Sequence, residues 1–274
     1  MTDTALWIPV GALAEGFAPE ANILDATSDL VGRTFSLHFG NGWVIEHRFK
    51  SHGDLEWQIQ AGPDAGAHAT ERYLATTLRD GIYFVDFIKS GERAMSVSLV
   101  LDLTKGIFTA VIGQLPTEAE ASRPLRDRVA KNDELTPVTV QFAHGTIDRP
   151  FDASGPSHGV TDELIGKRVF YKYSATEEYE HIYLNPCLYA WHCIVGVEKG
   201  LGDSDACHYH KVDDQLYLFV WREKIVPTLG VIMIDLRRGK TTGKIMGYEG
   251  ADFGVLSNFQ VGAVARVLNQ TSYK

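Results

Sequence analysis

The sequence has little cysteine, no run of basic residues and no long apolar stretch, and each shortage removes a class of protein. Three cysteines among 274 residues, without a Cys-x-x-Cys pair, give no disulfide framework and fit a reduced compartment. A formal net charge of -9 argues against nucleic acid or an anionic membrane as a partner. No segment approaches the ~20 apolar residues of a membrane span, and the first residues do not resemble a signal peptide. We therefore expect a cytoplasmic protein.

Several functional motifs are also missing. The sequence has no Gly-x-Ser-x-Gly elbow, no phosphate-binding loop and no dinucleotide-binding fingerprint, so we expect no cofactor. Apolar residues make up 45% of the chain and charged residues 22%, which is the composition of a soluble globular protein. The length allows one large domain or two of ordinary size.

The chain repeats itself. Sliding the sequence by 134 positions aligns residues 30–113 with residues 164–247 without a gap. Identical pairs in this register include Leu30/Leu164, His47/His181, Trp57/Trp191, Tyr83/Tyr217 and Gly113/Gly247. So long a period indicates two copies of a closed domain rather than a solenoid. We place the boundary in the turn-rich stretch 148–159, which gives domains 1–150 and 151–274.

Each copy reads as a series of short strands. In the first copy the residue pattern predicts Thr34–Phe39, Trp43–Lys50, Leu55–Ala61, Tyr73–Leu78, Ile82–Ile88, Met95–Asp102 and Ile107–Gly113. In the second copy it predicts Val169–Ser174, Tyr179–Leu184, Tyr189–Val195, Ala206–Val212, Gln215–Trp221, Gly230–Asp235 and Lys244–Tyr248. About eight short antiparallel strands per copy predict an up-and-down barrel, which has no exposed edge and holds side chains or one small ligand.

Three other stretches carry local signals. Asn41-Gly42, between two predicted strands, favours a hairpin with a type I′ turn. Residues 1–29 contain prolines and glycines that argue against a long regular element. Residues 115–131 are polar and indicate a short surface helix before a further strand at Thr136–Ala143.

The stretch Gln215–Lys224 holds the most informative side chain. Successive strand residues point to opposite faces, so one face carries Tyr217, Phe219, Trp221 and Glu223. A carboxyl group among aromatic rings has a raised pKa and can donate or accept a proton near neutral pH. The alternative is that Glu223 ends the strand in solvent and pairs with a neighbouring cation, Lys224 or Arg222.

The second copy resembles the phenolic acid decarboxylases, which are small lipocalin-like barrels. The resemblance rests on Gly166, Tyr171-Lys-Tyr173, Glu178-Tyr-Glu180, Trp191-His192 and Trp221-Arg-Glu223, with Asn41-Gly-Trp43 matching in the first copy. In that family two tyrosines bind the substrate carboxylate, an arginine assists and a glutamate handles the proton. The resemblance implies these roles for Tyr171, Tyr173 and Glu223. His192 stands where the family has arginine, so anion binding would depend on pH.

Over nearly its whole length the chain resembles the MoaF family more closely. This resemblance rests on runs such as Glu180-His-Ile-Tyr-Leu-Asn185, Leu216-Tyr-Leu-Phe-Val-Trp-Arg-Glu-Lys224 and Thr241-Thr-Gly-Lys-Ile-Met-Gly247. It implies an N-terminal and a C-terminal calycin-like domain. The family name points to molybdenum cofactor biosynthesis, for which the sequence offers neither a cysteine-rich cluster site nor a nucleotide loop. The expected fold is all-β: two tandem lipocalin/calycin-like antiparallel β-barrels from an internal duplication.

The two copies differ at the positions that the first resemblance marks. In the shared register, Tyr171, Tyr173, His192 and Glu223 become Leu37, Phe39, Gln58 and Lys89. This pattern favours an active C-terminal barrel and an N-terminal barrel that keeps the fold without catalysis. We therefore expect four catalytic residues: Glu223, Tyr171, Tyr173 and His192. Around the substrate we expect Tyr183, His208, Tyr217, Phe219 and Trp221.

The histidines have structural alternatives. His208 and His210 share one face of a predicted strand, a spacing that can ligate a metal. Strand histidines without a placed third ligand are more often not a metal site, and we expect no metal. His181 has a counterpart, His47, in the copy that lacks the tyrosines, which favours a structural role at a barrel end.

Two functions fit these features, and a third is structural. The first is a cofactor-independent lyase (decarboxylase-like) or isomerase that acts on a small aromatic or conjugated acid in the C-terminal barrel. The second is a lipocalin-like binding protein for a hydrophobic small molecule, without catalysis. The third gives both barrels a structural role in a larger assembly. The expected partner is a small-molecule ligand or substrate, and a homodimer stays open.

Overall fold

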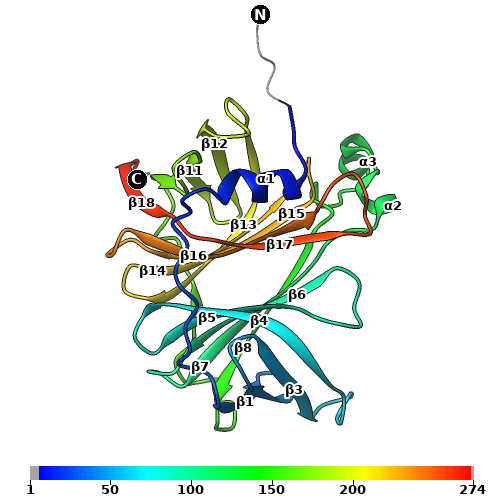
Figure 1. Ribbon diagram of the computed structural model, residues 1–274, viewed down its shortest axis with the longest axis vertical. Coiled ribbons are helices and arrows are strands. Elements are labelled where there is room, and N and C mark those ends of the chain that lie inside the picture. The colour runs from blue at the N-terminus through cyan, green and yellow to red at the C-terminus, as the bar shows by residue number, and fades with distance from the viewer. Residues whose placement is uncertain (1–5, 273–274) are drawn as a thin grey trace, which may run out of the picture. The chain divides into compact units, whose positions relative to one another are not determined.

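The computed structural model describes residues 6–272, which divide into two compact units (Figure 1). One unit comprises Leu24–Gln114 and Val140–Gly159 and holds the first copy of the repeat. The other comprises the chain up to Ile23, Leu115–Thr139 and the chain from Val160 onward. This division differs from a single boundary at residue 150, because two segments that precede the second copy pack with it.

The first unit is a closed antiparallel barrel of eight strands in sequence order. They are β1 (Thr34–Phe39), β2 (Val44–Phe49), β3 (Asp54–Ala61), β4 (His68–Arg79), β5 (Ile82–Ile88), β6 (Met95–Asp102), β7 (Ile107–Gln114) and β8 (Thr139–Ile147). Strand β8 pairs with β1 and closes the ring. Alternate residues of the strands point inward, and apolar ones such as Phe49, Leu55 and Leu99 form a core with no more than 1% exposure.

The second unit contains three short helices and a second closed barrel. The helices are α1 (Val10–Phe17), α2 (Glu118–Ala121) and α3 (Leu125–Ala130). The strands are β9 (Gly159–Val160), β10 (Lys167–Lys172), β11 (Glu178–Asn185), β12 (Leu188–Val195), β13 (Gly202–Asp213), β14 (Leu216–Glu223), β15 (Thr228–Asp235), β16 (Lys240–Tyr248), β17 (Leu256–Val261) and β18 (Val264–Gln270). Pairing of β12 with β13 closes the ring, while β9 adds to β13 and β17 lies along β16.

The strand positions confirm the duplication. Strands β4 and β13 begin and end 134 residues apart, and β3 and β12 do the same. Strands β5 and β14 start 134 residues apart as well. The sequence register therefore carries over into the pairing pattern, and the expected all-β fold of two tandem barrels is confirmed.

The hairpin at Asn41-Gly42 forms, but its turn type differs from the expectation. A type I′ turn needs positive φ at both central residues, whereas Gly42 has φ +88° and Asn41 lies outside the positive-φ region. The amide of Gly42 donates to the carbonyl of Phe39, and the amide of Phe39 donates to the carbonyl of Trp43. This is a longer loop, in which the glycine alone takes the left-handed conformation.

Helix α1 is the element of the N-terminal segment that the sequence did not predict. Pro9 precedes it at the N-cap position, and its apolar residues Val10, Leu13 and Phe17 fall on one buried face at helical spacing. The helix packs against β16 and β17 (Figure 1). The approach is close, because a Cβ added to Gly247 of β16 would lie 2.2 Å from the Val10 side chain. A glycine at this point therefore lets the helix sit directly on the strand.

Among the described residues, no helix is both long enough and apolar enough to span a bilayer.

Candidate active site in the second barrel

Strand β14 carries its aromatic residues and Glu223 to the same side of the barrel wall. Tyr217, Phe219 and Trp221 all belong to the buried core cluster of the second barrel. Phe219 and Trp221 stack with ring centroids 5.4 Å apart, as side chains two residues apart on one strand face can do. Trp221 and Glu223 both line a small pocket at the end of this stack. Glu223 therefore does not follow the alternative in which it ends the strand in solvent.

The pocket has a volume of about 30 Å³. That is room for about two water molecules. Its walls are aromatic side chains from β11, β12 and β14, with two carboxylic acids, Glu198 and Glu223. Two residues of α1, Leu13 and Phe17, also line it, and the Phe17 ring stacks on Tyr173 with centroids 4.9 Å apart. Helix α1 therefore covers the pocket.

Glu223 has a pKa raised well above its ordinary value. Burial is the main cause, and the negative charges of Asp205 and Glu198 act in the same direction. The indole N–H of Trp221 donates a hydrogen bond to Glu223 Oε1 at 2.9 Å, which opposes the shift. The direction agrees with the expectation from sequence. The carboxylate neighbours and the indole donor were not part of that expectation.

Glu198 is the second acid of the pocket, and sequence analysis did not single it out. Burial raises the pKa of Glu198 to about 7, and the nearby Glu177 adds to the rise. The hydroxyl of Tyr179 donates to Glu198 Oε2 at 3.0 Å and opposes it. Glu198 lies in the turn after β12, and its counterpart in the first copy is Asp64, which is exposed. The available signal was Tyr179, whose counterpart Ile45 has no hydroxyl.

The two tyrosines expected to act as a pair have different environments. Tyr173 lines the pocket, and its pKa is raised first by burial and then by the charge of Glu223. Tyr171 is fully buried, and its hydroxyl shares a 2.6 Å hydrogen bond with that of Tyr183. The structure thus brings Tyr173 and Glu223 into one pocket, whereas Tyr171 and Tyr183 satisfy each other outside its lining.

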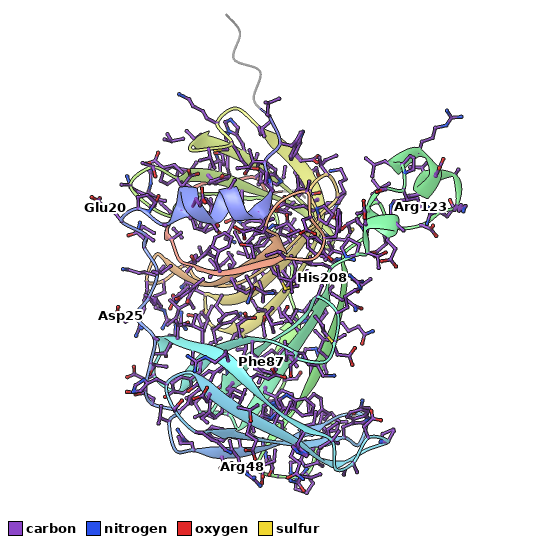
Figure 2. All side chains as sticks on the ribbon, turned by 45° about the vertical axis from the view of Figure 1, so that its right-hand side comes forward. Glu20, Asp25, Arg48, Phe87, Arg123 and His208 are labelled. Carbon is purple, nitrogen blue, oxygen red and sulfur yellow. The ribbon has the colours of Figure 1, made fainter. Side chains whose placement is uncertain are left out.

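His192 and His208 lie away from the pocket, contrary to the roles expected for them. On β12 the pocket-lining residues are Tyr189 and Trp191, so His192, next to Trp191, points the other way and is exposed. On β13, His208 alternates with the buried Cys207 and Tyr209 of the core. The charges that act on His208 (labelled in Figure 2) are those of Arg222 and Glu134, outside the lumen. Neither histidine can contact a molecule held beside Glu223.

Two further residues expected around the substrate also lie outside the pocket lining. The ring of Tyr217 is buried, and its hydroxyl donates to Glu163 Oε2 at 2.8 Å. Phe219 is stacked between Tyr209 and Trp221, and it supports the wall rather than lining the pocket. Trp221 alone among the five expected residues reaches the pocket.

His181 lines the pocket, where a structural role at a barrel end was expected. Its ring lies among those of Tyr171, Tyr189 and Trp221, with centroid distances of 4.7 to 6.1 Å. Burial lowers the pKa of His181 to about 3, so the imidazole is neutral. Its Nδ1 atom is buried without a hydrogen-bond partner among the described residues. Since His181 lines the pocket, a bound molecule could satisfy this atom.

The described part of the chain contains no group of three or more histidine, cysteine, aspartate or glutamate side chains placed to hold a metal ion. His210 is buried, unlike its half-buried neighbour on the same strand face, His208. Within residues 6–272, no third ligand joins these two histidines.

Comparison with known proteins agrees with this architecture. Residues 5–117 match the MoaF N-terminal domain, and residues 158–271 match the MoaF C-terminal domain. Protein MoaF of Klebsiella aerogenes is 47% identical over 277 residues, covering 100% of both chains. A solved structure titled "Crystal Structure of a putative beta-lactamase from Burkholderia vietnamiensis" aligns with a TM-score of 0.33 and 13% identity, covering 45% of this chain and 97% of that one. A similarity that weak carries no argument.

The fold defines a protein of two tandem calycin-like barrels, one of which encloses a pair of glutamates. The chain belongs to the MoaF family. Similarity of the second copy to phenolic acid decarboxylases stays a prediction from the sequence.

Proposed function

We propose that the second barrel is a cofactor-independent acid–base catalyst, a decarboxylase-like lyase or an isomerase, for a small aromatic or conjugated acid. The observation that carries the proposal is the pocket in which Glu223, Glu198 and Tyr173 meet among aromatic rings. Carboxyl groups with raised pKa values hold protons near neutral pH and can deliver them to a reacting atom.

Glu223 is the proton donor in this proposal. Burial raises the pKa of the Glu223 carboxyl well above its ordinary value, which favours the protonated form, and burial also raises the pKa of Glu198, to about 7. In a decarboxylation, Glu223 protonates a carbon of the conjugated acid and the bond to the carboxylate breaks. The electron pair of that bond stays on the organic product, and carbon dioxide leaves. A proton from water then restores Glu223. The aromatic wall favours this loss of charge.

Tyr173 orients the substrate. Among the described residues its hydroxyl has no hydrogen-bond partner of the kind that Tyr183 is for Tyr171, and Tyr173 lines the same pocket as Glu223. A neutral phenol is a hydrogen-bond donor to an anionic oxygen. The raised pKa of Tyr173 keeps its proton in place across the physiological range.

Substrate entry requires α1 to move. A pocket of about 30 Å³ is far below the ~300 Å³ at which small-molecule sites begin. Leu13 and Phe17 occupy the place where an aromatic acid would lie between the rings. Displacement of this eight-residue helix would enlarge the pocket without breaking a strand pair.

The test is turnover of a panel of hydroxycinnamic and related conjugated acids, followed by carbon dioxide release and by absorbance. Glu223→Gln is expected to lower the rate by about 10²- to 10⁴-fold, the usual contribution of a general acid. Glu163→Gln is the matched control, because Glu163 also accepts a hydrogen bond from an aromatic side chain, here the hydroxyl of Tyr217, but lies outside the pocket. No turnover with any acid of the panel, or equal rates for the two variants, would contradict the proposal.

Binding without catalysis is the second candidate. The buried, unpartnered Nδ1 of His181 supports it, since a ligand can satisfy that atom without reacting. Native mass spectrometry of the purified protein separates the two functions. A co-purified molecule recovered intact after incubation with the wild-type protein would favour a carrier.

A further inference from the structure

A cavity larger than the pocket at Glu223 lies in the first barrel, the copy from which no activity was expected. It has a volume of about 370 Å³, against about 30 Å³ in the second barrel. That volume lies within the range of ~300 to 1,000 Å³ typical of small-molecule sites. Most of the lining side chains belong to the barrel strands, such as Phe87 on β5 (labelled in Figure 2).

The chemistry of the cavity wall is simple. Apart from Asn41, His47, Lys89 and Gln141, every lining residue is apolar. Burial lowers the pKa of His47 to about 4, so that imidazole is neutral, and its Nδ1 lies 3.2 Å from the carbonyl of Ile45. Lys89 is therefore the charged group of the wall. None of the lining residues is an acid.

Lys89 is held where a ligand could reach it. Its ammonium nitrogen lies 5.7 Å from the centre of the Trp57 ring, which also lines the cavity. Its side chain is 31% exposed, and the one ion pair it makes among the described residues is to the exposed Glu92 at 3.5 Å. A long ion pair at the surface contributes little. An anion in the cavity can therefore replace Glu92 at small cost.

Comparison with the second barrel gives an independent reason to connect this lysine with a ligand. Lys89 occupies the register position of Glu223, the acid of the other pocket. The supporting contact is kept: Trp57 donates to Glu71 at 3.2 Å, and Trp191 donates to Asp205 at 3.0 Å, in the same register. The indole–carboxylate pair is thus shared, and the charge at the neighbouring lumen position is reversed.

We propose that the first barrel binds a hydrophobic carboxylic acid, with its carboxylate at Lys89 beside Trp57 and its apolar body in the barrel. The apolar part of the ligand lies along Phe87, Leu99 and Ala110 and displaces water from this apolar wall. The paired Lys89 supplies charge-assisted hydrogen bonds to the carboxylate at the cavity mouth. This site is separate from the pocket at Glu223 and needs no chemical step.

The test uses three probes of equal chain length: decanoate, decanol and decylamine. Isothermal titration of the full chain is expected to rank decanoate first and decylamine last. Lys89→Met keeps the apolar stem of the side chain and removes the charge. It is expected to weaken decanoate binding about fivefold to tenfold and to leave decanol binding unchanged. Lys50→Met, which removes a lysine paired with Glu56 outside the cavity, is expected to change neither.

The location of binding is tested by filling the cavity. Ala110→Phe on β7 and Val97→Phe on β6 are each expected to abolish binding of decanoate and decanol together. Val97 is only half-buried, so its variant keeps the test valid if the buried Ala110→Phe fails to fold. Glu223→Gln is expected to leave decanoate binding unchanged, which separates this site from the proposed catalytic one.

Three results would overturn the proposal: binding of none of the three probes, equal affinity for decanoate and decanol, or decanoate binding that Lys89→Met does not change.

Discussion

The two barrels have equivalent strands but differ in the side chains that fill their interiors. The first has an open lumen of about 370 Å³, and the second has about 30 Å³ left between aromatic rings. At four buried core positions of the shared register the first copy has a small or aliphatic residue where the second copy has an aromatic ring: Leu37/Tyr171, Leu55/Tyr189, Ala75/Tyr209 and Val85/Phe219. Main-chain hydrogen bonds hold the wall in both copies, so the inward side chains were free to diverge in volume and charge.

The largest expected effect comes from making the second lumen resemble the first. Tyr209→Ala introduces the residue of the first copy, Ala75, at a side chain that is 1% exposed. Removing a large buried ring costs about 3–5 kcal/mol of unfolding free energy, because the surrounding rings collapse only in part. Urea denaturation of the full chain measures it. A loss below about 1 kcal/mol would show that the ring stack of the second barrel is not tightly packed.

A somewhat smaller effect is expected at the helix that covers the second pocket. Phe17→Ala removes a ring that stacks on Tyr173 and is 6% exposed. We expect a loss of about 2–4 kcal/mol, together with a pocket that admits larger molecules. Thermal shift with hydroxycinnamic acids, compared between wild type and variant, checks the second point. Leu6→Ala is a control, because Leu6 is 73% exposed in the same segment.

Glu198, one of the two acids of the second pocket, makes the unfolding free energy depend on pH. The folded pKa of Glu198 is about 7 against an unfolded value near 4.5, so the folded state binds the proton more tightly. The unfolding free energy therefore falls as pH rises from about 4.5 to about 7 and changes no further above that. Glu198→Gln removes this fall, so its stability relative to wild type should rise by up to about 3 kcal/mol across that interval.

The difference between variant and wild type must be used for this measurement, because two histidines act in the opposite sense. The folded pKa values of His181 and His47 are lowered by burial to about 3 and about 4. Their contribution rises with pH toward the unfolded value of about 6.5, and it is common to both proteins. A Glu198→Gln profile parallel to that of wild type would mean that this carboxyl titrates normally.

The smallest effect tests what the barrels have in common. Trp57→Phe and Trp191→Phe each remove an indole donor to a buried carboxylate, Glu71 or Asp205. Each carboxylate keeps other donors, so we expect losses of about 1–2 kcal/mol that agree within about 0.5 kcal/mol. Denaturation of both variants under the same conditions measures the match. A large difference would mean that the shared contact supports the two copies unequally.

The fold could be predicted because the same strand pattern occurs twice in a constant register, so each copy supports the strands predicted in the other. Glu223 could be predicted because strand alternation places it with Trp221. The same rule argues against His192: its neighbour Trp191 lines the pocket, and adjacent strand residues cannot both point inward. The resemblance to phenolic acid decarboxylases identified the sequence position of His192, but it did not show to which side of the strand its side chain points.

The remaining features depend on tertiary packing that no local pattern encodes. Helix α1 has eight residues and two glycines, and the strands it packs against, β16 and β17, lie more than 200 residues later in the chain. Glu198 is a turn residue whose pKa is raised by burial and by the charge of Glu177, against the hydrogen bond from Tyr179. The cavity of the first barrel exists because the inward side chains do not fill the lumen. A sequence does not show which side chains leave such a space between them.

Because the ribosome synthesises the chain from its N-terminus, the two units can complete their packing at different stages of translation. All strands of the first barrel have been synthesised once β8 ends at Ile147, so that barrel can close while the rest is still being made. Helix α1 is synthesised long before its docking surface, since β16 begins at Lys240 and β17 ends at Val261. The apolar face of Val10, Leu13 and Phe17 therefore has no strands to pack against until β16 and β17 have been made.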